Sequence, residues 1–119
     1  MKKTLVLGAT PNPSRYAYLA MHALLRHGHA AVPVGIRAGD VAGIPIQQGM
    51  PDVPDVDTVT LYVGPERQPP YYEYLLGLKP RRIIFNPGTE NPALAALAQA
   101  RGIETVEGCT LVMLSIGNY

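Results

Sequence analysis

The sequence is poor in cysteine, in long hydrophobic runs and in charge. Cys109 is the only cysteine among 119 residues, so no disulfide can form within the chain, and a reducing compartment, the cytoplasm, is expected. The apolar run near the N-terminus breaks at Gly8, which predicts no export signal. The run at 111–114 is far shorter than the roughly 20 residues that a membrane span needs. With 47% hydrophobic and 16% charged residues, residues 1–119 are expected to form one compact domain away from membranes.

Acidic residues are absent from the first third of the chain. Residues 1–39 contain five basic residues and no aspartate or glutamate, whereas residues 40–119 contain five basic and nine acidic residues. The net charge is only +1, and basic and aromatic side chains are not interleaved, which argues against nucleic acid as a partner. The uneven distribution favours a small anionic ligand.

Short apolar runs alternate with stretches of helical spacing. Six strands are predicted, at residues 4–7, 31–34, 44–47, 58–62, 82–85 and 104–106. Helices are predicted at residues 14–27, from Pro70 to about Leu76, after the Asn91 cap up to Gly102, and at residues 111–116. This alternation predicts a Rossmann-like α/β fold, with a parallel sheet of order 3-2-1-4-5-6 and helices on both faces.

A ligand of such a fold binds in the crevice at the carboxyl ends of the strands. The loops at that edge are residues 8–15, 35–39, 63–69 and 86–91. Residues 66–70 are placed beside the crevice, where they can act as a lid. The aspartates before the strand at 58–62 are expected at the opposite edge, and they are Asp52, Asp55 and Asp57.

Helical spacing also predicts which side chains pack on the sheet. In the first helix, which Gly28 ends as a left-handed cap, the packed stripe is predicted to contain Tyr16, Leu19, Ala20, Ala23, Leu24 and His27. In the second, it is predicted to contain Tyr71, Tyr74, Leu75 and Leu78. Tyr72 is then the tyrosine expected to be exposed.

Two parts of a dinucleotide-binding fingerprint are missing. Only Gly8 of its three glycines is present, and two prolines in the turn lack N–H groups. The remaining anion donors are predicted to be the N–H groups of Ala9, Thr10 and Asn12, the Thr10 hydroxyl, and the N–H groups around Ser14 and Arg15. The acid that NAD binding favours after the second strand is replaced by Arg37, which either holds a ribose phosphate or is a solvated loop residue.

Five stretches of the sequence resemble those of a known family. The stretches "TLVLGATPNPSRYA", "AAVPVGIR", "GIPI", "VDTVTLYVGP" and "RRIIFNPGTENPALAALAQARGIETVEGC" occur in the order found in small stand-alone CoA-binding proteins. The domain of those proteins is similar to the N-terminal part of the succinyl-CoA synthetase α subunit. The chain departs from the family pattern at Gly35-Ile36, where Asn-Pro is common, and at Asn86, where Gln is common.

The resemblance implies that the ADP part of CoA lies across the carboxyl edge of the sheet. It assigns phosphate-loop roles to Gly8, Ala9, Thr10, Ser14 and Arg15. It places Val34, Gly35, Ile36 and Arg37 beside the adenosine, and it closes the crevice with Val63, Gly64, Asn86, Pro87 and Gly88.

Three functions stay open at this point. The first is binding of CoA or acyl-CoA without chemistry of its own, since no nucleophile–base pair stands at a recognisable spacing. The second is an enzyme subunit that uses NADP or another nucleotide, and the third is a ligand-free Rossmann-like scaffold for protein association, with a homodimer among its forms. His22, His27 and His29 lack a partner pattern for zinc. Cys109 is interpreted as a buried, inert thiol rather than a reactive one.

Overall fold

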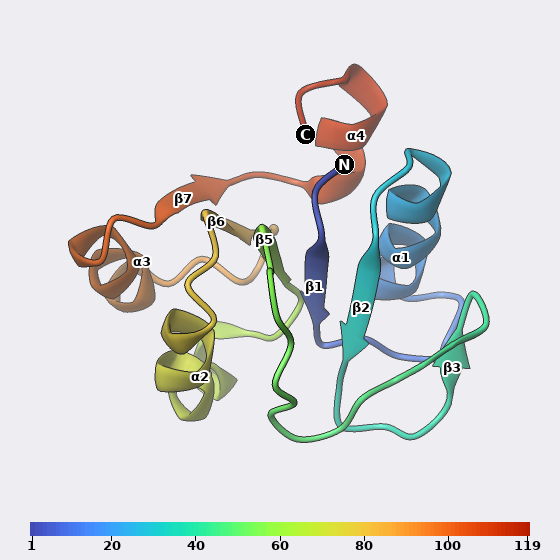
Figure 1. Ribbon diagram of the computed structural model, residues 1–119, viewed down its shortest axis with the longest axis horizontal. Coiled ribbons are helices and arrows are strands. Elements are labelled where there is room, and N and C mark those ends of the chain that lie inside the picture. The colour runs from blue at the N-terminus through green and yellow to red at the C-terminus, as the bar shows by residue number, and fades with distance from the viewer.

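The computed structural model describes all 119 residues and confirms the predicted α/β fold class. Five parallel strands form one sheet in the order β2-β1-β5-β6-β7 (Figure 1). Their bounds are β1 Thr4–Leu7, β2 Ala31–Val34, β5 Thr58–Leu61, β6 Arg82–Phe85 and β7 Glu104–Glu107. Leu7, the last residue of β1, pairs with Val34 on one side and with Leu61 on the other. The carboxyl ends of the strands therefore meet at one edge of the sheet.

Helices cover both faces of this sheet. The helices α1 (Tyr16–Arg26) and α4 (Thr110–Ile116) lie on one face, and α2 (Tyr72–Gly77) and α3 (Pro92–Ala100) lie on the other (Figure 1). Successive side chains of β1 point to opposite faces of the sheet, so they belong to two separate core clusters. Leu5 and Leu7 pack in the cluster that contains the apolar residues of α2 and α3, whereas Val6 packs with α1 and α4. Because both faces of β1 are covered, its run is apolar nearly throughout.

The third predicted strand is found only in part. Within residues 44–47, Ile44–Pro45 forms β4, which pairs antiparallel with β3 (Asp40–Val41) in a small separate hairpin. Only Gln47 bridges to β2, opposite Val34. The hairpin turn places Ala42 and its neighbouring glycine at positive φ, and Pro45 has no N–H to donate to a sheet. The observed order thus matches the predicted order 3-2-1-4-5-6 for five of its strands. The third predicted strand is missing from the sheet, where only the bridge of Gln47 to β2 takes its place.

The stripe of α1 that faces the sheet differs from the predicted one. The buried residues are Ala17, Ala20, Met21, Ala23 and Leu24. Tyr16, Leu19 and His27 were included in the predicted stripe, but Tyr16 and Leu19 are 71% and 42% exposed and His27 is exposed as well. Two stripes of helical period overlap in this segment, and the one that includes Ala17 and Met21 packs because small residues let the helix approach the sheet closely. The side chain of Tyr16 is thereby left beside the crevice.

The remaining helices follow their predicted caps. Asn91 accepts hydrogen bonds from the N–H groups of Ala93 and Leu94, as an N-cap of α3 does. Gly117 ends α4 in the left-handed conformation, so the C-terminal segment is the predicted helix. Two 3-10 turns, η1 (Pro65–Arg67) and η2 (Pro69–Tyr71), precede α2, whose predicted start was Pro70.

Both ends of the chain lie at the amino edge of the sheet (Figure 1). The Nζ atom of Lys2 donates to the backbone oxygen of Tyr119 at 2.6 Å, and the buried Arg82 guanidinium lies 4.3 Å from the centre of the Tyr119 ring. The N–H of Asp57 donates to the Lys3 carbonyl at 2.9 Å, which places this aspartate at the amino edge as predicted. The termini therefore leave the carboxyl edge uncovered.

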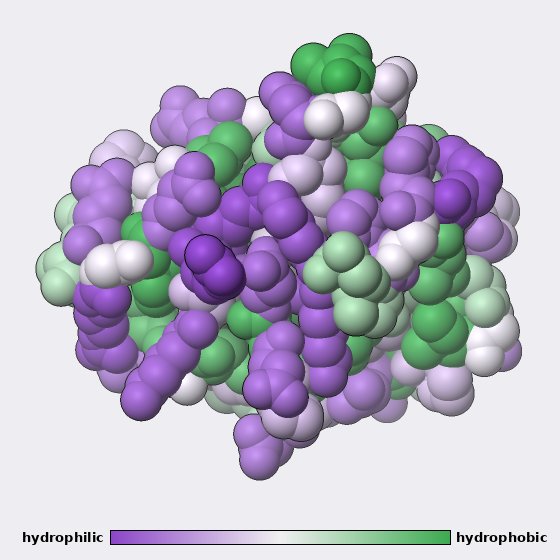
Figure 2. Space-filling model, turned by 45° about the horizontal axis from the view of Figure 1, so that its top comes forward, coloured by the Kyte–Doolittle hydropathy of each residue, from purple (hydrophilic) through white to green (hydrophobic).

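The surface is mostly polar where the amino edge comes forward. Figure 2 shows hydrophilic residues over most of this face and a hydrophobic group at its top, where α4 lies. The large exposed apolar residues of α4 are Val112 and Ile116. None of the helices combines the length and the hydrophobicity that crossing a membrane requires.

Candidate functional site

The largest crevice lies at the carboxyl edge of the sheet and has a volume of about 680 Å³. Most of the predicted site residues line it, and these are Gly8, Ala9, Thr10, Arg15, Gly35, Ile36, Arg37, Val63, Gly64, Pro87 and Gly88. They come from the loops after β1, β2, β5 and β6, which is the edge that the topology predicts. Asn12, Ser14, Val34 and Asn86 do not line it, although they were included in the predicted site.

Two glycines let the loops at the floor of the crevice approach each other. A Cβ on Gly35 would stand 2.2 Å from the carbonyl oxygen of Ala9, so only glycine fits after β2. A Cβ on Gly8 would stand 2.9 Å from the backbone of Tyr62, and Gly8 also has φ 97°. The departure from the family pattern at Gly35 thus has a steric reason in this chain.

Several predicted anion donors are already used inside the turn. The N–H groups of Gly8 and Ala9 both donate to the Val34 carbonyl, at 2.9 and 3.0 Å. The N–H of Asn12 donates to the Thr10 hydroxyl at 3.2 Å, and the N–H of Ser14 donates to Asn12 Oδ1 at 3.0 Å. The predictions that Ala9, Asn12 and Ser14 offer N–H groups to a ligand are therefore wrong. These groups shape the turn.

The free donors lie in the turn after β1, at Thr10, and at the start of α1, one or two residues after the predicted Ser14 and Arg15. The N–H groups of Thr10, Tyr16 and Ala17 have no acceptor within the chain, and these three residues line the crevice. No side chain caps α1, and its first turn holds no acid. The helix dipole and the unpaired N–H groups therefore both favour an anion at this point.

The charge of the crevice is positive. Arg15, Arg37 and Arg67 line it, and no aspartate or glutamate does. The chain has one ion pair, between Arg101 and Glu73, so none of the three crevice arginines is neutralised by a carboxylate. Of the nearby acids, Glu66 packs against Gly64 and Glu90 accepts from the N–H of Gly88 at 2.8 Å. Arginine side chains without carboxylate partners are suited to bind phosphate.

Asn86 does not line the crevice; it is buried and connects the elements around it through hydrogen bonds. Its Nδ2 donates to the Thr60 hydroxyl at 2.7 Å and to the Leu61 carbonyl at 2.9 Å, while its Oδ1 accepts from the N–H of Thr110 at 2.9 Å. The side chain is buried and all its hydrogen-bonding positions face the protein. Asn86 therefore fixes the end of β6 to β5 and to the first turn of α4.

The segment 65–71 forms a wall of the crevice. Gln68 within it is fully buried, and its Nε2 donates to the carbonyls of Val63 and Thr89, at 2.9 and 2.8 Å. Its Oε1 accepts from Asn91 Nδ2 at 2.8 Å. These bonds tie the segment to the loop after β6, so it is described better as a fixed wall than as the suggested lid.

Several residues that line the crevice were not among the predicted ligand-binding residues, although Arg67 and Pro70 belong to the segment that was placed beside it. These lining residues are Tyr16, Ala17, Met50, Tyr62, Arg67, Pro70, Tyr71 and Thr89. Tyr71 packs against the core as predicted and also lines the crevice. Tyr72 was predicted to be exposed, but it is half-buried and its hydroxyl accepts a hydrogen bond from Asn91. The position of Arg67 in the loop after the fourth predicted strand was a signal that could have identified it.

Tyr62 lines the crevice, whereas Cys109 does not. The Tyr62 hydroxyl is buried near Thr110 and Thr60, and its burial raises the pKa of this phenol well above its usual range. Cys109 is partly buried at the start of α4. No group of three or more His, Cys, Asp or Glu side chains comes together as a metal site would require.

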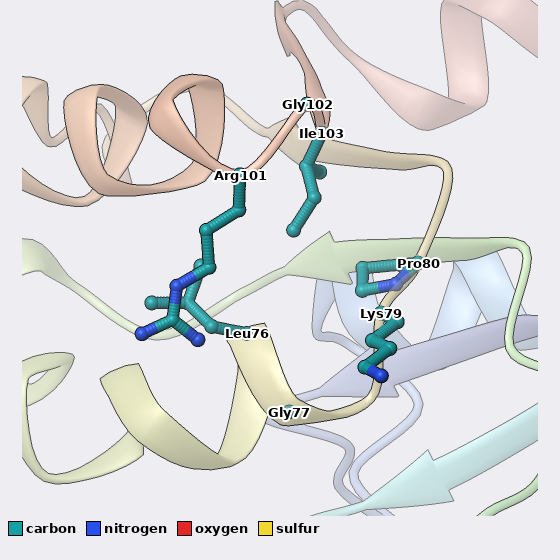
Figure 3. Close-up of a pocket in the computed structure, with 7 residues that line it drawn as sticks. All are labelled: Leu76, Gly77, Lys79, Pro80, Arg101, Gly102 and Ile103. Atoms are coloured by element: carbon teal, nitrogen blue, oxygen red, sulfur yellow. The ribbon is translucent and has the colours of Figure 1, made fainter.

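A second hollow of about 270 Å³ lies at the amino edge, before β6 and β7 (Figure 3). Arg101 extends from the end of α3 toward Leu76 at the end of α2, and Lys79 follows α2. Cations beside the carboxyl ends of two helices stabilise the unpaired carbonyls there. Arg101 also forms an ion pair with Glu73 at 3.5 Å, so its side chain connects α3 to α2.

Comparisons with known proteins identify the family of the chain. The model of a family described as "CoA binding domain" matches residues 2–115. A crystal structure of an uncharacterized protein is 55% identical, with a TM-score of 0.98, over 100% of this chain and 98% of that chain. A hypothetical protein from Pyrococcus horikoshii OT3 is 28% identical, with a TM-score of 0.88, over 97% of this chain and 82% of that one.

A larger protein shares the fold alone. The dinucleotide-forming acetyl-coenzyme A synthetase 1 of Ca. Korarchaeum cryptofilum, solved with phosphate and ADP, is 19% identical with a TM-score of 0.69. The likeness covers 89% of this chain but 25% of that chain. No curated protein matches the sequence.

Proposed function

Because the chain belongs to the family of CoA-binding domains, we propose that it binds coenzyme A or an acyl-CoA in the crevice at the carboxyl edge of the sheet. The observation that carries this proposal is the set of Arg15, Arg37 and Arg67 around the unpaired N–H groups at the start of α1, with no acid lining the crevice. Anionic phosphates supply the acceptors and charges that these groups lack.

Each part of the nucleotide has a matching part of the crevice. The pyrophosphate is assigned to Thr10, to the N–H groups of Tyr16 and Ala17, and to Arg15. The ribose phosphate is assigned to Arg37, and the adenosine to the loop of Gly35 and Ile36. The residues Val63, Gly64, Pro87 and Gly88 close the crevice. The ligand is bound in the cytoplasm and without a catalytic step by the chain itself.

NADP is a second candidate ligand, because Arg37 stands where NAD-binding proteins carry an acid. A guanidinium can bind the 2′-phosphate of NADP as well as the 3′-phosphate of CoA. The two ligands differ in where that phosphate lies on the ribose, so their affinities decide between them.

Thermal shifts with CoA, dephospho-CoA, NADP, NAD and ATP test the proposal, since a ligand that binds only the folded state raises the midpoint according to its affinity. CoA is expected to give the largest shift, and dephospho-CoA a smaller one. NADP above CoA would favour the nucleotide-dependent enzyme subunit. No shift with any of the five would refute ligand binding and favour a scaffold for protein association.

The role of Arg37 is tested with the same ligands. Arg37→Ala is expected to bring the CoA shift down to that of dephospho-CoA, because the lost guanidinium binds the phosphate that dephospho-CoA lacks. Arg81→Ala is the matched control, since Arg81 is exposed and precedes β6 at the opposite edge. An unchanged difference between the two ligands in the Arg37 variant would remove Arg37 from the proposed site.

A further inference from the structure

We infer that Arg67 is a pyrophosphate-binding residue that determines affinity from the opposite wall of the crevice, an inference that rests on the proposed function. The sequence places residues 66–70 beside the crevice, but neither its patterns nor the family resemblance gives Arg67 a ligand-binding role. It is exposed, it lines the crevice, and it ends η1 in the loop after β5.

The strand order places Arg67 opposite Arg37. Arg37 follows β2 and Arg67 follows β5, and the two strands flank β1. The turn after β1 and the start of α1, which hold the unpaired N–H groups, therefore lie between the two arginines. Arg67 therefore reaches an anion bound to those N–H groups from one side, and Arg37 lies on the other side of that anion. Arg67 thus acts on the pyrophosphate, whereas Arg37 acts on the ribose phosphate.

The backbone that presents Arg67 is fixed before any ligand arrives. The neighbouring Gln68 is fully buried and makes three hydrogen bonds through its side chain. The N–H of Arg67 donates to the Gly64 carbonyl at 3.0 Å, and prolines stand at 65, 69 and 70. Prolines restrict the backbone, so less conformational entropy is lost when a ligand is bound.

The charge of Arg67 is available for a ligand. No carboxylate of the chain lies within ion-pair distance of it, since the single ion pair joins Arg101 and Glu73. The adjacent Glu66 places its carboxylate against Gly64 instead. A guanidinium that is carried by a fixed backbone and has no counter-charge binds phosphate oxygens through charge-assisted hydrogen bonds.

The test compares the affinities of CoA, dephospho-CoA and pantetheine by calorimetry for wild type, Arg67→Ala, Arg67→Lys and Arg37→Ala. Arg67→Ala is expected to weaken CoA and dephospho-CoA by the same factor, about tenfold or more, because one charge-assisted contact to the pyrophosphate is lost. Pantetheine, which has no phosphate, is expected to be unaffected. Arg67→Lys is expected to recover part of the affinity, and Arg37→Ala to weaken CoA alone.

The outcomes separate this inference from the proposed function. If wild type binds no CoA, the proposed function fails and the inference falls with it. If wild type binds CoA and Arg67→Ala leaves the affinity unchanged, or weakens CoA but not dephospho-CoA, only the inference is overturned. The Arg81→Ala variant controls for the loss of one positive charge, and unchanged thermal midpoints without ligand confirm that the variants fold.

Discussion

Among the glycines, Gly35 has the least room for an added side chain. One added carbon would stand 2.2 Å from the Ala9 carbonyl oxygen, which belongs to the turn that also carries the donors for the proposed anion. Gly35→Ala is expected to lower the free energy of unfolding by about 1–3 kcal/mol, because the backbone must shift to accept the methyl group. Urea denaturation measures this loss.

Gly77→Ala is the control for that experiment. Gly77 lies in α2, no atom stands within 4 Å of a Cβ placed there, and it does not have positive φ. Alanine is the better helix former, so this variant is expected to be as stable as wild type or more stable. If Gly35→Ala unfolds at the same urea concentration as wild type, the loops after β1 and β2 are less closely packed than described.

His29 makes stability depend on pH. The N–H of Lys2 donates to His29 Nδ1 at 2.9 Å, so this nitrogen is unprotonated in the fold. Burial lowers the pKa of His29 below 6.5, and the positive N-terminal amine, Lys2, His27 and Arg82 lower it further. The folded state thus binds this proton less readily than the unfolded state does. The corresponding stability is present above pH 6.5 and is lost as the pH falls from there to the lower folded pKa.

Thermal midpoints at about pH 7.5 and about pH 5.5 test this linkage. Wild type is expected to melt at a lower temperature at the acidic pH, and His29→Gln is expected to show a smaller difference between the two midpoints. His27→Gln, at an exposed position two residues away, is expected to reduce the difference less than His29→Gln does, because His27 only adds to the lowered pKa of His29 through its charge. The same pH dependence in His29→Gln as in wild type would assign the effect to other groups.

At the scale of elements, Asn86 connects β6, β5 and α4 through one buried amide. Asn86→Ala leaves the Thr60 hydroxyl, the Leu61 carbonyl and the Thr110 N–H without this partner. The variant is expected to lose about 3 kcal/mol of unfolding free energy, since buried polar groups without partners are costly. Hydrogen exchange at the Thr110 amide is expected to become faster, because the bond to Asn86 Oδ1 protects that amide.

The control for Asn86 is Gln99→Ala. Gln99 is exposed and donates one hydrogen bond to the Thr105 hydroxyl, so its removal is expected to cost less than about 0.5 kcal/mol. Equal losses in the two variants would show that Asn86 does not hold the elements together as proposed.

The strands and helices were predictable where local sequence alone determines them. The run at β1 is buried on both faces. Asn91 has the side-chain acceptor that a helix N-cap requires, and Gly117, without a side chain, adopts the left-handed conformation of a C-cap. The hairpin of β3 and β4 was not predictable, because its pairing depends on a turn with positive φ at Ala42, a residue that rarely adopts it.

The candidate site was predictable by loop but not by side chain. Topology brings the loops of Arg15 and Arg37 to one edge, and that much follows from the strand order. Whether an N–H such as that of Ala9 is free depends on the close approach of β2, which no local pattern reveals. Gln68 is hydrophilic and yet fully buried, because three partners from distant segments surround it.

Across the whole molecule, a positive side chain is buried at the amino edge of the sheet, whereas positive side chains are exposed at the carboxyl edge. At the amino edge, Arg82 is buried against Tyr119 and donates to the Thr58 hydroxyl at 2.9 Å, so its charge is enclosed by the fold. At the carboxyl edge, the three arginines of the crevice are exposed and have no carboxylate partner. A net charge of +1 conceals this separation.

The separation predicts that CoA binding weakens with salt. Raising the salt from about 0.05 M to about 0.5 M shortens the screening length from about 14 Å to about 4 Å, so exposed arginines attract phosphates less strongly. Calorimetry is expected to show a several-fold loss of CoA affinity over this range. The triple variant Arg15→Ala, Arg37→Ala, Arg67→Ala is expected to bind weakly at both concentrations, with a smaller relative loss. A wild-type affinity that is the same at both concentrations would mean that the exposed charges of the crevice do not hold the ligand.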